Sequence, residues 1–230
     1  MINIENVVLP HGEWWKSVIM GARNPKNSWH LSDSNIFTDY DVNFCRYLEL
    51  FEMGPKDLDL LMRLSTGGRV HAKYRRHIPL ILEITAPLYF WKEFDQYKIG
   101  VYPNPGEIDT NSCSTMHKIH SKEFTLDDFS HERLTEASKK ILIDTIKYLN
   151  QMRACHNEAK PGYKETYFPQ MIQLLPSSYN QKRTVMLNYE VLANMYESRK
   201  AHKLHEWREL CKWIESLPYS EIITCKEVEE

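Results

Sequence analysis

Apolar residues recur with the period of an α-helix in five stretches of the chain, which predict five helices. These helices cover residues 38–54, 55–68, 130–160, 189–200 and 202–218. In the first, Val42, Cys45 and Leu48 fall at helical spacing, and Gly54 ends it. Pro55 opens the second helix, in the turn where proline is tolerated.

The long helix at 130–160 is predicted to present one apolar face, with lysines on the opposite face. We expect this face to pack on a sheet or on another subunit. Its members are Leu134, Ala137, Ile141, Thr145, Leu149 and Met152.

Two shorter apolar stretches predict buried strands, at 78–87 (IPLILEITAP) and 182–188 (KRTVMLN). Residues 101–112 contain two prolines, a glycine and turn formers, and predict a loop. Residues 1–37 mix tryptophans with Gly, Pro, Asn and Ser, which predicts an irregular N-terminal arm. No repeat or linker divides residues 1–230, so we expect a single α+β domain.

The stretch ITAPLYFWKEFDQYKIG at 84–100 combines two kinds of pattern. It begins as a core element with a cluster of aromatic residues and ends in acids, amides and lysines. A loop follows directly, which places the stretch at the edge of the fold, where binding groups are common. We therefore expect it to be either an amphipathic helix end or one wall of a ligand site.

Composition narrows the class of protein. The chain is 42% hydrophobic and carries 29 basic and 31 acidic residues in mixed order, so no global field would attract nucleic acid or a membrane surface. Its five cysteines and ten histidines show neither a zinc-ligand spacing nor a metalloprotease motif. The N-terminus lacks a signal-peptide pattern, and no apolar run could span a membrane. The expectation is a cytoplasmic protein without a metal.

Three groups could carry chemistry. Arg199 continues the apolar stripe of Leu192 and Met195, so its guanidinium needs an acid, an exit to water or an anionic ligand. The basic segment at 69–77 could cradle phosphates or form a solvated face. Cys113 lies near two histidines in sequence, but spacing does not show the closeness that a thiolate nucleophile requires. The remaining chemistry would suit a bound organic cofactor, which the protein mainly positions and polarises.

The order of these segments resembles the flavin-dependent thymidylate synthases over roughly residues 65–210. That family has a His-x5-His pair, a strand ending in Ala-Pro, an aromatic helix and an Arg-His-Arg triplet. In the family, Leu-Pro and a strand then follow. After the strand come an Asn, a second Asn six residues later and an Arg eleven residues later. The counterparts here are His71 and His77, Ala86-Pro87, Leu175-Pro176, Asn188, Asn194 and Arg199.

The resemblance implies an α+β fold with a central, twisted, mostly antiparallel sheet flanked by helices. It also implies a homotetramer whose shared sites hold FAD and deoxyuridylate, with methylenetetrahydrofolate and NADPH as co-substrates. Arg199 would bind the uracil and act in catalysis. The implied flavin residues are His71, Gln96, Tyr97, Lys98, Asn188 and Asn194. The implied substrate residues are Glu93, Cys113, Ser114, Thr115 and Arg199.

The chain departs from the family at several charged positions. The triplet is Gln96-Tyr97-Lys98, an insertion covers about 102–110, and Glu190 stands where the family often has a basic residue. The family's Ser-Gly-Arg is matched by 113–115, which loses an arginine unless Lys118 replaces it. Another arginine is missing at 172–173. Each lost charged hydrogen bond would cost about 1.5–3 kcal/mol, unless Arg69, Arg75 or Lys98 compensates.

Three hypotheses follow. The first is FAD-dependent, folate-linked C5 methylation of deoxyuridylate to thymidylate. The second is a related flavin enzyme that modifies another pyrimidine nucleotide, for example by hydroxymethylation. The third is a non-catalytic relative that binds a nucleotide or a protein partner.

Overall fold

The computed structural model describes residues 2–41, 46–98 and 110–225, and these residues form two compact units. Unit 1 consists of residues 1–5, 83–96 and 110–185, and unit 2 of residues 6–82, 97–109 and 186–230. Each unit is built from segments far apart in the sequence, and each is described by itself below. The assignment of one domain to 1–230 stays a prediction.

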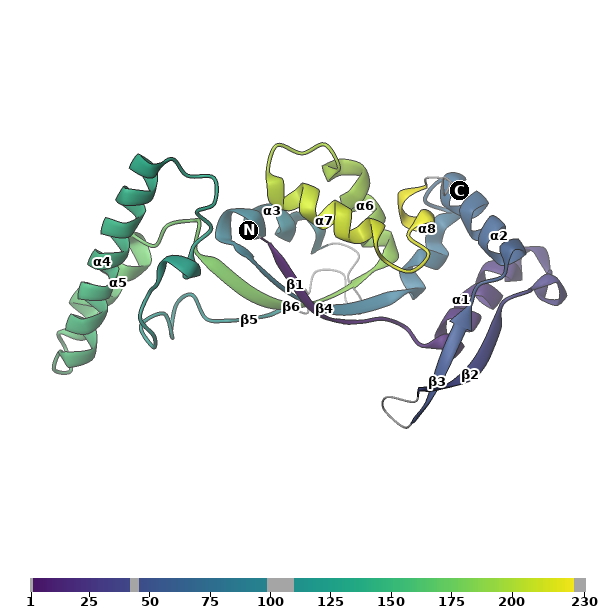
Figure 1. The fold of residues 1–230 in the computed structure, drawn as a ribbon, viewed down its shortest axis with the longest axis horizontal. Helices are drawn as coiled ribbons and strands as arrows, with labels where there is room; N and C mark the ends of the chain where they lie inside the picture. The colour runs from purple at the N-terminus through teal and green to yellow at the C-terminus, as the bar shows by residue number, and fades with distance from the viewer. Residues whose placement is uncertain (1, 42–45, 99–109, 226–230) are drawn as a thin grey trace. The chain divides into compact units, whose positions relative to one another are not determined.

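A four-stranded sheet has the strand order β1-β4-β6-β5 (Figure 1). Its strands are β1 (Asn3–Val8), β4 (Pro79–Pro87), β6 (Asn180–Asn188) and β5 (Thr110–Ser112). β5 pairs with β6 in antiparallel register, with Ser112 opposite Arg183. The strands predicted at 78–87 and 182–188 are confirmed. In β4 the alternate residues Leu80, Leu82, Ile84 and Ala86 are buried, as expected for a pleated strand with one face in the core.

Unit 1 contains three α-helices among its described residues. They are α3 (Leu88–Phe94), α4 (Glu136–Glu158) and α5 (Lys164–Gln173), with the short 3-10 turn η5 (Leu126–Asp128). The 3-10 turn η4 (Asp95–Lys98) crosses the boundary, since Tyr97 belongs to unit 2. The aromatic stretch after Ala86-Pro87 is core: Phe90, Trp91 and Phe94 are buried in α3. The Trp91 Nε1 donates to the carbonyls of Ala86 and Gln181, at 3.0 Å each.

The predicted face of the long helix is confirmed at Leu149 and Met152 and wrong toward the start of the helix. Ile141 is 69% exposed, whereas Leu142, Ile146 and Leu149 are buried. α5 lies beside α4 and covers these buried residues (Figure 1), so over the first half of the helix tertiary packing selects the stripe next to the predicted one. α5 itself was not predicted, and Pro169 lies inside it, where proline is unfavourable in a helix.

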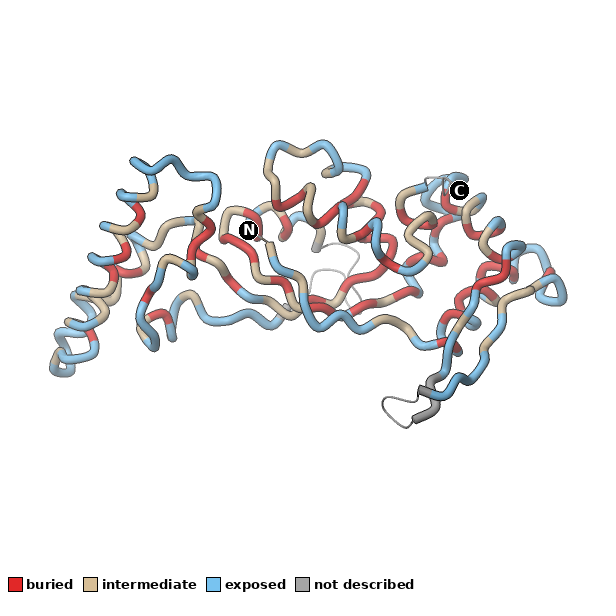
Figure 2. Tube along the Cα trace, in the orientation of Figure 1, coloured by how far each residue is buried: buried red, intermediate tan, exposed pale blue. Residues whose placement is uncertain are grey.

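Unit 2 contains five α-helices among the described residues and a two-stranded hairpin. The helices are α1 (Gly12–Arg23), α2 (Pro55–Thr66), α6 (Tyr189–Arg199), α7 (His205–Glu215) and α8 (Glu221–Thr224). The hairpin strands are β2 (Asn35–Asp41) and β3 (Arg46–Glu52), and the 3-10 turns are η1 (Asn24–Lys26), η2 (Trp29–Leu31) and η3 (Ala72–His77). The predicted helices that became α2, α6 and α7 are confirmed. Figure 2 shows buried residues along most of α6.

The prediction of an irregular arm at 1–37 is wrong. α1 buries Trp15, Val18, Ile19 and Ala22, which recur at helical spacing on one face. The glycine and proline clusters that suggested irregularity fall at the ends of this helix, where they are compatible with it.

The helix predicted at 38–54 is also wrong, because β2 and β3 form an antiparallel hairpin there. Ile36 pairs with Phe51, and the Phe51 ring stacks on Trp15 with centroids 6.0 Å apart. The two strands are rich in aromatic and β-branched residues, which suit a pleated surface that packs on α1. Val42 and Cys45, which carried the helical interpretation, lie outside the described residues.

Asn188 caps α6 as predicted, since its Oδ1 accepts a hydrogen bond from the Val191 N–H at 3.0 Å. We expect Asn188→Ala to lower the free energy of unfolding by about 1 kcal/mol, because this N–H loses its partner. Urea unfolding measures the change. Asn188→Ser keeps a capping oxygen and should stay near the unsubstituted protein; an Ala variant with an unchanged midpoint would show that the cap contributes nothing.

Candidate functional site

Arg199 ends α6 against two aromatic side chains of unit 2. Its Nε donates a hydrogen bond to the Tyr97 hydroxyl at 2.9 Å. Its guanidinium carbon lies 4.9 Å from the ring centroid of Trp207 and 5.6 Å from that of Tyr97. Trp207 is fully buried. The half-buried guanidinium is thus held by a hydroxyl and two π faces, a setting that stabilises a cation while fixing its plane.

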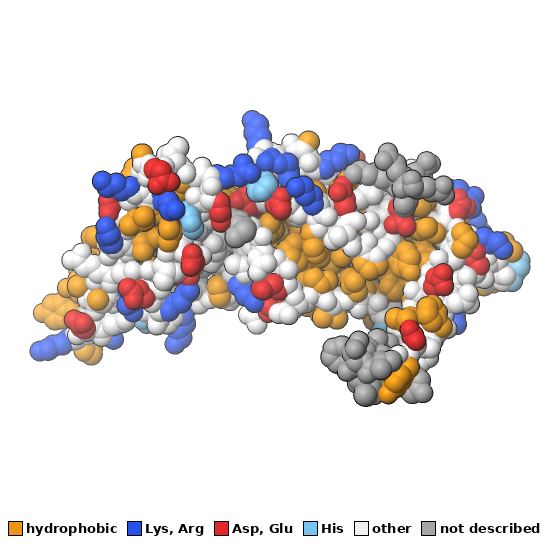
Figure 3. Space-filling view, in the orientation of Figure 1, with side chains coloured by type: hydrophobic (Ala, Val, Ile, Leu, Met, Phe, Trp, Pro, Cys, Tyr) orange, Lys and Arg blue, Asp and Glu red, His pale blue; other side chains and the backbone are white. Residues whose placement is uncertain are grey.

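Three local structures bring these residues together. Tyr97 lies in η4 after the aromatic helix, Arg199 lies in the last turn of α6, and Trp207 lies in the first turn of α7. Arg208 holds the intervening turn, since its Nη1 donates to the carbonyls of His202 and Lys203 at 2.5 and 3.0 Å. Figure 3 shows Lys and Arg side chains gathered over the α6–α7 turn.

A second group surrounds a polar pocket of about 320 Å³ in unit 2, beside Asn194. Cations line it from three places in the chain: Arg69 before η3, Arg75 in η3 and Lys200 after α6. Glu197 also lines it. Part of the basic segment at 69–77 therefore faces a hollow rather than forming a purely solvated face.

A third group lies in unit 1, where Cys113 and Ser114 line a pocket of about 400 Å³ with Lys118. The Ser114 Oγ accepts hydrogen bonds from the N–H groups of Met116 and Lys118, at 3.3 and 3.1 Å. The Cys113 N–H donates to the Lys182 carbonyl at 3.0 Å, which attaches this segment to β6. The pocket thus joins hydroxyl and ammonium groups, a donor set that suits an anion.

Two other lysines of this pocket are already paired, and Asp127 adds a carboxylate to its lining. Lys182 lies 2.6 Å from Glu83, and Lys122 forms an ion pair with Asp128. Burial raises the pKa of Asp128, but hydrogen bonds from Lys122 and Thr125 outweigh it and leave that pKa below its usual value. Lys118 forms no ion pair with a described residue, so its ammonium is the cation most available to a ligand here.

The remaining predicted site residues lie on different elements. Asn188 is buried as the α6 cap, His71 is exposed before η3, and Gln96 is exposed in η4. Glu93 is half-buried in α3 and Thr115 half-buried after Ser114. The side chain of Lys98 and the loop at 102–109 lie outside the described part of the chain.

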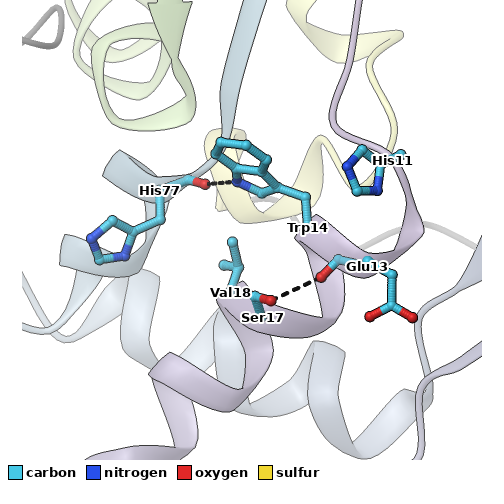
Figure 4. A pocket seen from close by; sticks show the side chains of 6 residues that line it. All are labelled: His11, Glu13, Trp14, Ser17, Val18 and His77. Carbon is cyan, nitrogen blue, oxygen red and sulfur yellow. Dashed lines mark hydrogen bonds between the residues drawn. The ribbon is translucent and has the colours of Figure 1, made fainter.

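Sequence reasoning missed a further pocket on α1, of about 400 Å³ (Figure 4). His11, Glu13, Trp14, Ser17, Val18 and His77 line it. The Trp14 Nε1 donates to the His77 carbonyl at 2.6 Å, which links α1 to the predicted His-x5-His pair. The helical spacing of apolar residues in 15–22 was the signal that could have revealed α1 and this pocket.

A histidine pair in unit 1 adjoins the segment that carries Lys118. The rings of His120 and His156 lie 4.6 Å apart between centroids, and Phe168 packs near both. The His120 Nδ1 is buried without a hydrogen-bond partner among the described residues. Burial, and then the charges of His156, Lys118 and Lys164, lower the pKa of His120 below its ordinary value of 6.5.

This lowered pKa makes stability depend on pH. Below about pH 6.5 the unfolded chain takes up the proton that folded His120 resists, so stability is fully present above that pH. It should fall as the pH drops through the lower pKa of the folded state. Urea midpoints between pH 7.5 and 5 measure this loss. His120→Phe should reduce the slope of the urea midpoint against pH, and His117→Phe, at an exposed position, should not. Equal slopes in these two variants and the unsubstituted protein would contradict the assignment of the pH dependence to His120.

Among the described residues, no three His, Cys, Asp or Glu side chains are grouped to hold a metal ion. Likewise, none of the described helices combines the length and apolarity that crossing a membrane requires.

Solved structures exist whose fold is similar to that of this chain over nearly its whole length. One is the flavin-dependent thymidylate synthase ThyX of Helicobacter pylori, complexed with FAD and dUMP. It aligns over 95% of this chain and 96% of its own, at a TM-score of 0.59 and 17% identity. A second ThyX structure from that organism, with FAD and dUMP, aligns over 96% and 94% at the same score and identity. The chain has the fold of the flavin-dependent thymidylate synthases.

This flavin-dependent thymidylate synthase fold confirms the predicted class, an α+β fold with antiparallel strand pairs and flanking helices. It also confirms, at the level of the fold, the family resemblance carried by the ordered motifs. No family model and no curated protein sequence matches the chain. The likeness is therefore one of fold at low sequence identity.

Proposed function

We propose that the chain is an FAD-dependent enzyme of pyrimidine deoxynucleotides that methylates deoxyuridylate at C5 to give thymidylate. Methylenetetrahydrofolate would donate the carbon and NADPH would regenerate the reduced flavin. We further propose a cytoplasmic homotetramer with shared sites. The observation that carries the proposal is the contact between Tyr97 and Arg199. Both positions were assigned to the site from sequence motifs, and their side chains meet across 102 residues.

The residues present fit a flavin dinucleotide by their chemistry. Arg69, Lys200 and Asn194 line one pocket, and guanidinium, ammonium and amide groups are the donors that a diphosphate requires. Tyr97 and Trp207 add aromatic surface at the neighbouring end of α6. Bound flavin would supply the hydride that reduces the transferred one-carbon group.

The chain's own residues would bind and orient the nucleotide. The Arg199 guanidinium would donate to the uracil carbonyl oxygens, where it also stabilises negative charge that develops on the ring. The Tyr97 hydroxyl and the buried Trp207 would hold that guanidinium in one plane and keep water from its inner side. Taken by itself, the unit 1 pocket, where Ser114 and Lys118 supply hydroxyl and ammonium groups, would suit a phosphate.

No cysteine nucleophile is required by this proposal. Burial raises the pKa of Cys211 to about 11, with Glu215 adding to the effect, so this thiol stays protonated at neutral pH. Cys113 is exposed, and its carbonyl accepts a hydrogen bond from Gln181 at 3.0 Å. Its place in the pocket suits binding.

The deciding experiment is flavin titration followed by calorimetry with dUMP, and then rescue of a thymidine-requiring bacterial strain. Micromolar binding of both ligands together with rescue is the expected result. Flavin binding without dUMP binding would favour another pyrimidine nucleotide as substrate. A colourless protein that takes up no FAD would overturn the proposal and leave a non-catalytic relative of the fold.

A further inference from the structure

Arg183 is a half-buried arginine of β6 that contacts three side chains of unit 1. Its side chain is 14% exposed. Its Nε donates a hydrogen bond to the Gln181 Oε1 at 2.9 Å, and its Nη1 donates to the Asp95 Oδ1 at 2.9 Å. Its guanidinium carbon lies 4.3 Å from the ring centroid of Trp91. An amide, a carboxylate and an aromatic face therefore fix the plane of this guanidinium.

The ion pair with Asp95 attaches Arg183 to the point where α3 ends. Asp95 follows the last residue of α3, and its N–H donates to the carbonyls of Glu93 and Trp91. The Asp95 side chain is 31% exposed, so solvent screens the ion pair only in part. Gln96 comes next and begins the segment that corresponds to the Arg-His-Arg triplet of the family. Arg183 therefore holds the residue from which this segment starts.

Gln181 connects Arg183 to a second segment of the predicted site. It is 5% exposed and lies two residues before Arg183, so both side chains emerge on the same face of β6. Arginine offers only donors, so the amide must turn its oxygen toward Arg183. The Gln181 Nε2 then faces the Cys113 carbonyl and donates to it at 3.0 Å. Arg183 thus sets the orientation of the amide that holds Cys113.

Cys113 begins this second segment, which continues with Ser114 and Thr115. The Cys113 N–H donates to the Lys182 carbonyl at 3.0 Å, next to the β5–β6 pairing. With the Gln181 amide on its carbonyl, Cys113 is held to β6 through both of its backbone polar groups. Loss of the Gln181 contact would release the carbonyl that precedes Ser114.

We propose that Arg183 is a positioning residue that holds both segments of unit 1, at 95–96 and at 113–115. One nitrogen of the guanidinium reaches Asp95 directly, and another reaches Cys113 through Gln181. Hydrogen bonds from a charged donor are the stronger ones, and the arginine fork can serve two acceptors at once. That these segments bind a nucleotide rests on the proposed function; their common attachment to Arg183 does not.

Amide hydrogen exchange of the ligand-free full chain, followed by mass spectrometry, tests this attachment. Arg183→Met keeps an unbranched apolar stem beside Trp91 and removes both donors. We expect exchange to become at least about fivefold faster at both 95–97 and 112–116. Exchange in the middle of α4 should stay unchanged. Faster exchange at only one of the two segments, or to an equal degree throughout unit 1, would overturn the proposal.

Two further variants test the two contacts of Arg183 separately. Asp95→Ala should speed exchange at 95–97 and leave 112–116 unchanged, and Gln181→Met should do the reverse. If Arg183→Met does not fold, Arg183→Lys takes its place. Its single ammonium cannot serve both acceptors as the fork does, so exchange should rise at one of the two segments. Unchanged exchange at both segments in Arg183→Lys would overturn the proposal.

The matched control is Arg133→Met, the same substitution at an exposed position of unit 1. It removes a cation of the same kind without touching either segment's attachment to β6. Exchange at 95–97 and 112–116 should stay within about twofold of the unsubstituted protein. An effect of Arg133→Met equal to that of Arg183→Met would show that loss of charge alone loosens the segments.

Calorimetry with dUMP on the flavin-loaded protein tests whether the attachment positions a ligand site. Arg183→Met should weaken dUMP binding about tenfold, and Arg133→Met should not. Unchanged dUMP affinity in Arg183→Met would overturn the positioning role. If the unsubstituted protein binds neither FAD nor dUMP, the proposed function fails, and the exchange experiment alone decides whether Arg183 holds the two segments.

Discussion

Asp57→Asn is expected to lower the free energy of unfolding by about 3–5 kcal/mol, because it leaves Arg23 as a buried, unpaired charge. The Asp57 side chain is fully buried, and Arg23 is 3% exposed. The Arg23 Nε donates to Asp57 Oδ1 at 2.6 Å. The other carboxylate oxygen accepts from the hydroxyls of Ser32 and Ser34, both at 2.7 Å. The Asp57 carboxylate in α2 thus connects α2 to α1 and to the segment between η2 and β2.

Urea unfolding of Asp57→Asn measures this loss. The matched control is Asp59→Asn on the same helix, whose exposed pair with Arg63 should contribute less than about 1 kcal/mol. Burial raises the pKa of Asp57, but hydrogen bonds from Ser34, Ser32 and Arg23 outweigh it and lower the pKa below 3.8. This stability is present above about pH 3.8 and lost as the pH falls through the lower folded value. If Asp57→Asn and Asp59→Asn lose equal free energy of unfolding, the buried hydrogen bonds of Asp57 contribute no more than an exposed ion pair.

Arg199→Ala is expected to weaken dUMP binding about 10- to 100-fold, since a charged hydrogen bond to a ligand contributes about 1.5–3 kcal/mol. Calorimetry with dUMP on the flavin-loaded protein measures the change. Tyr97→Phe should cause a smaller loss of the same kind, because it keeps the ring beneath the cation and removes the oxygen that accepts from Nε.

Lys203→Ala is the matched control for Arg199, because it removes a nearby exposed cation from the same turn. It should leave dUMP binding within about twofold. If Arg199→Ala and Lys203→Ala have equal effects, Arg199 contributes only to the general field of the turn. Unchanged rescue of a thymidine-requiring strain by Arg199→Ala would likewise remove it from the catalytic role.

Elements with strong local signals could be predicted from the sequence. Pro55 starts α2, Asn188 caps α6, and Pro87 ends β4, and each of these residues acts through its immediate neighbours. The hairpin of β2 and β3 could not be predicted in this way. Its conformation depends on Phe51 stacking on Trp15, a contact between distant segments that no local period records.

The same distinction between local signals and distant contacts applies to the candidate site. Ordered motifs identified Arg199 and Tyr97, but their hydrogen bond joins residues 102 apart, so the partner of the guanidinium could not be deduced. The Arg75–Glu190 pair spans 115 residues. Sequence showed an acid at a position that is often basic in the family, and only the packing of η3 against α6 shows which cation it holds.

The interleaving of the two units bears on how the chain is made. Unit 2 includes residues 6–82 and residues 186–230, so its core cannot close until nearly the whole polypeptide has left the ribosome. α1 and α2 would emerge early with apolar faces that lack α6 and α8. Such late closure slows folding and prolongs exposure to aggregation. A nascent chain that stalls before β6 should therefore depend on chaperones and be degraded readily by proteases.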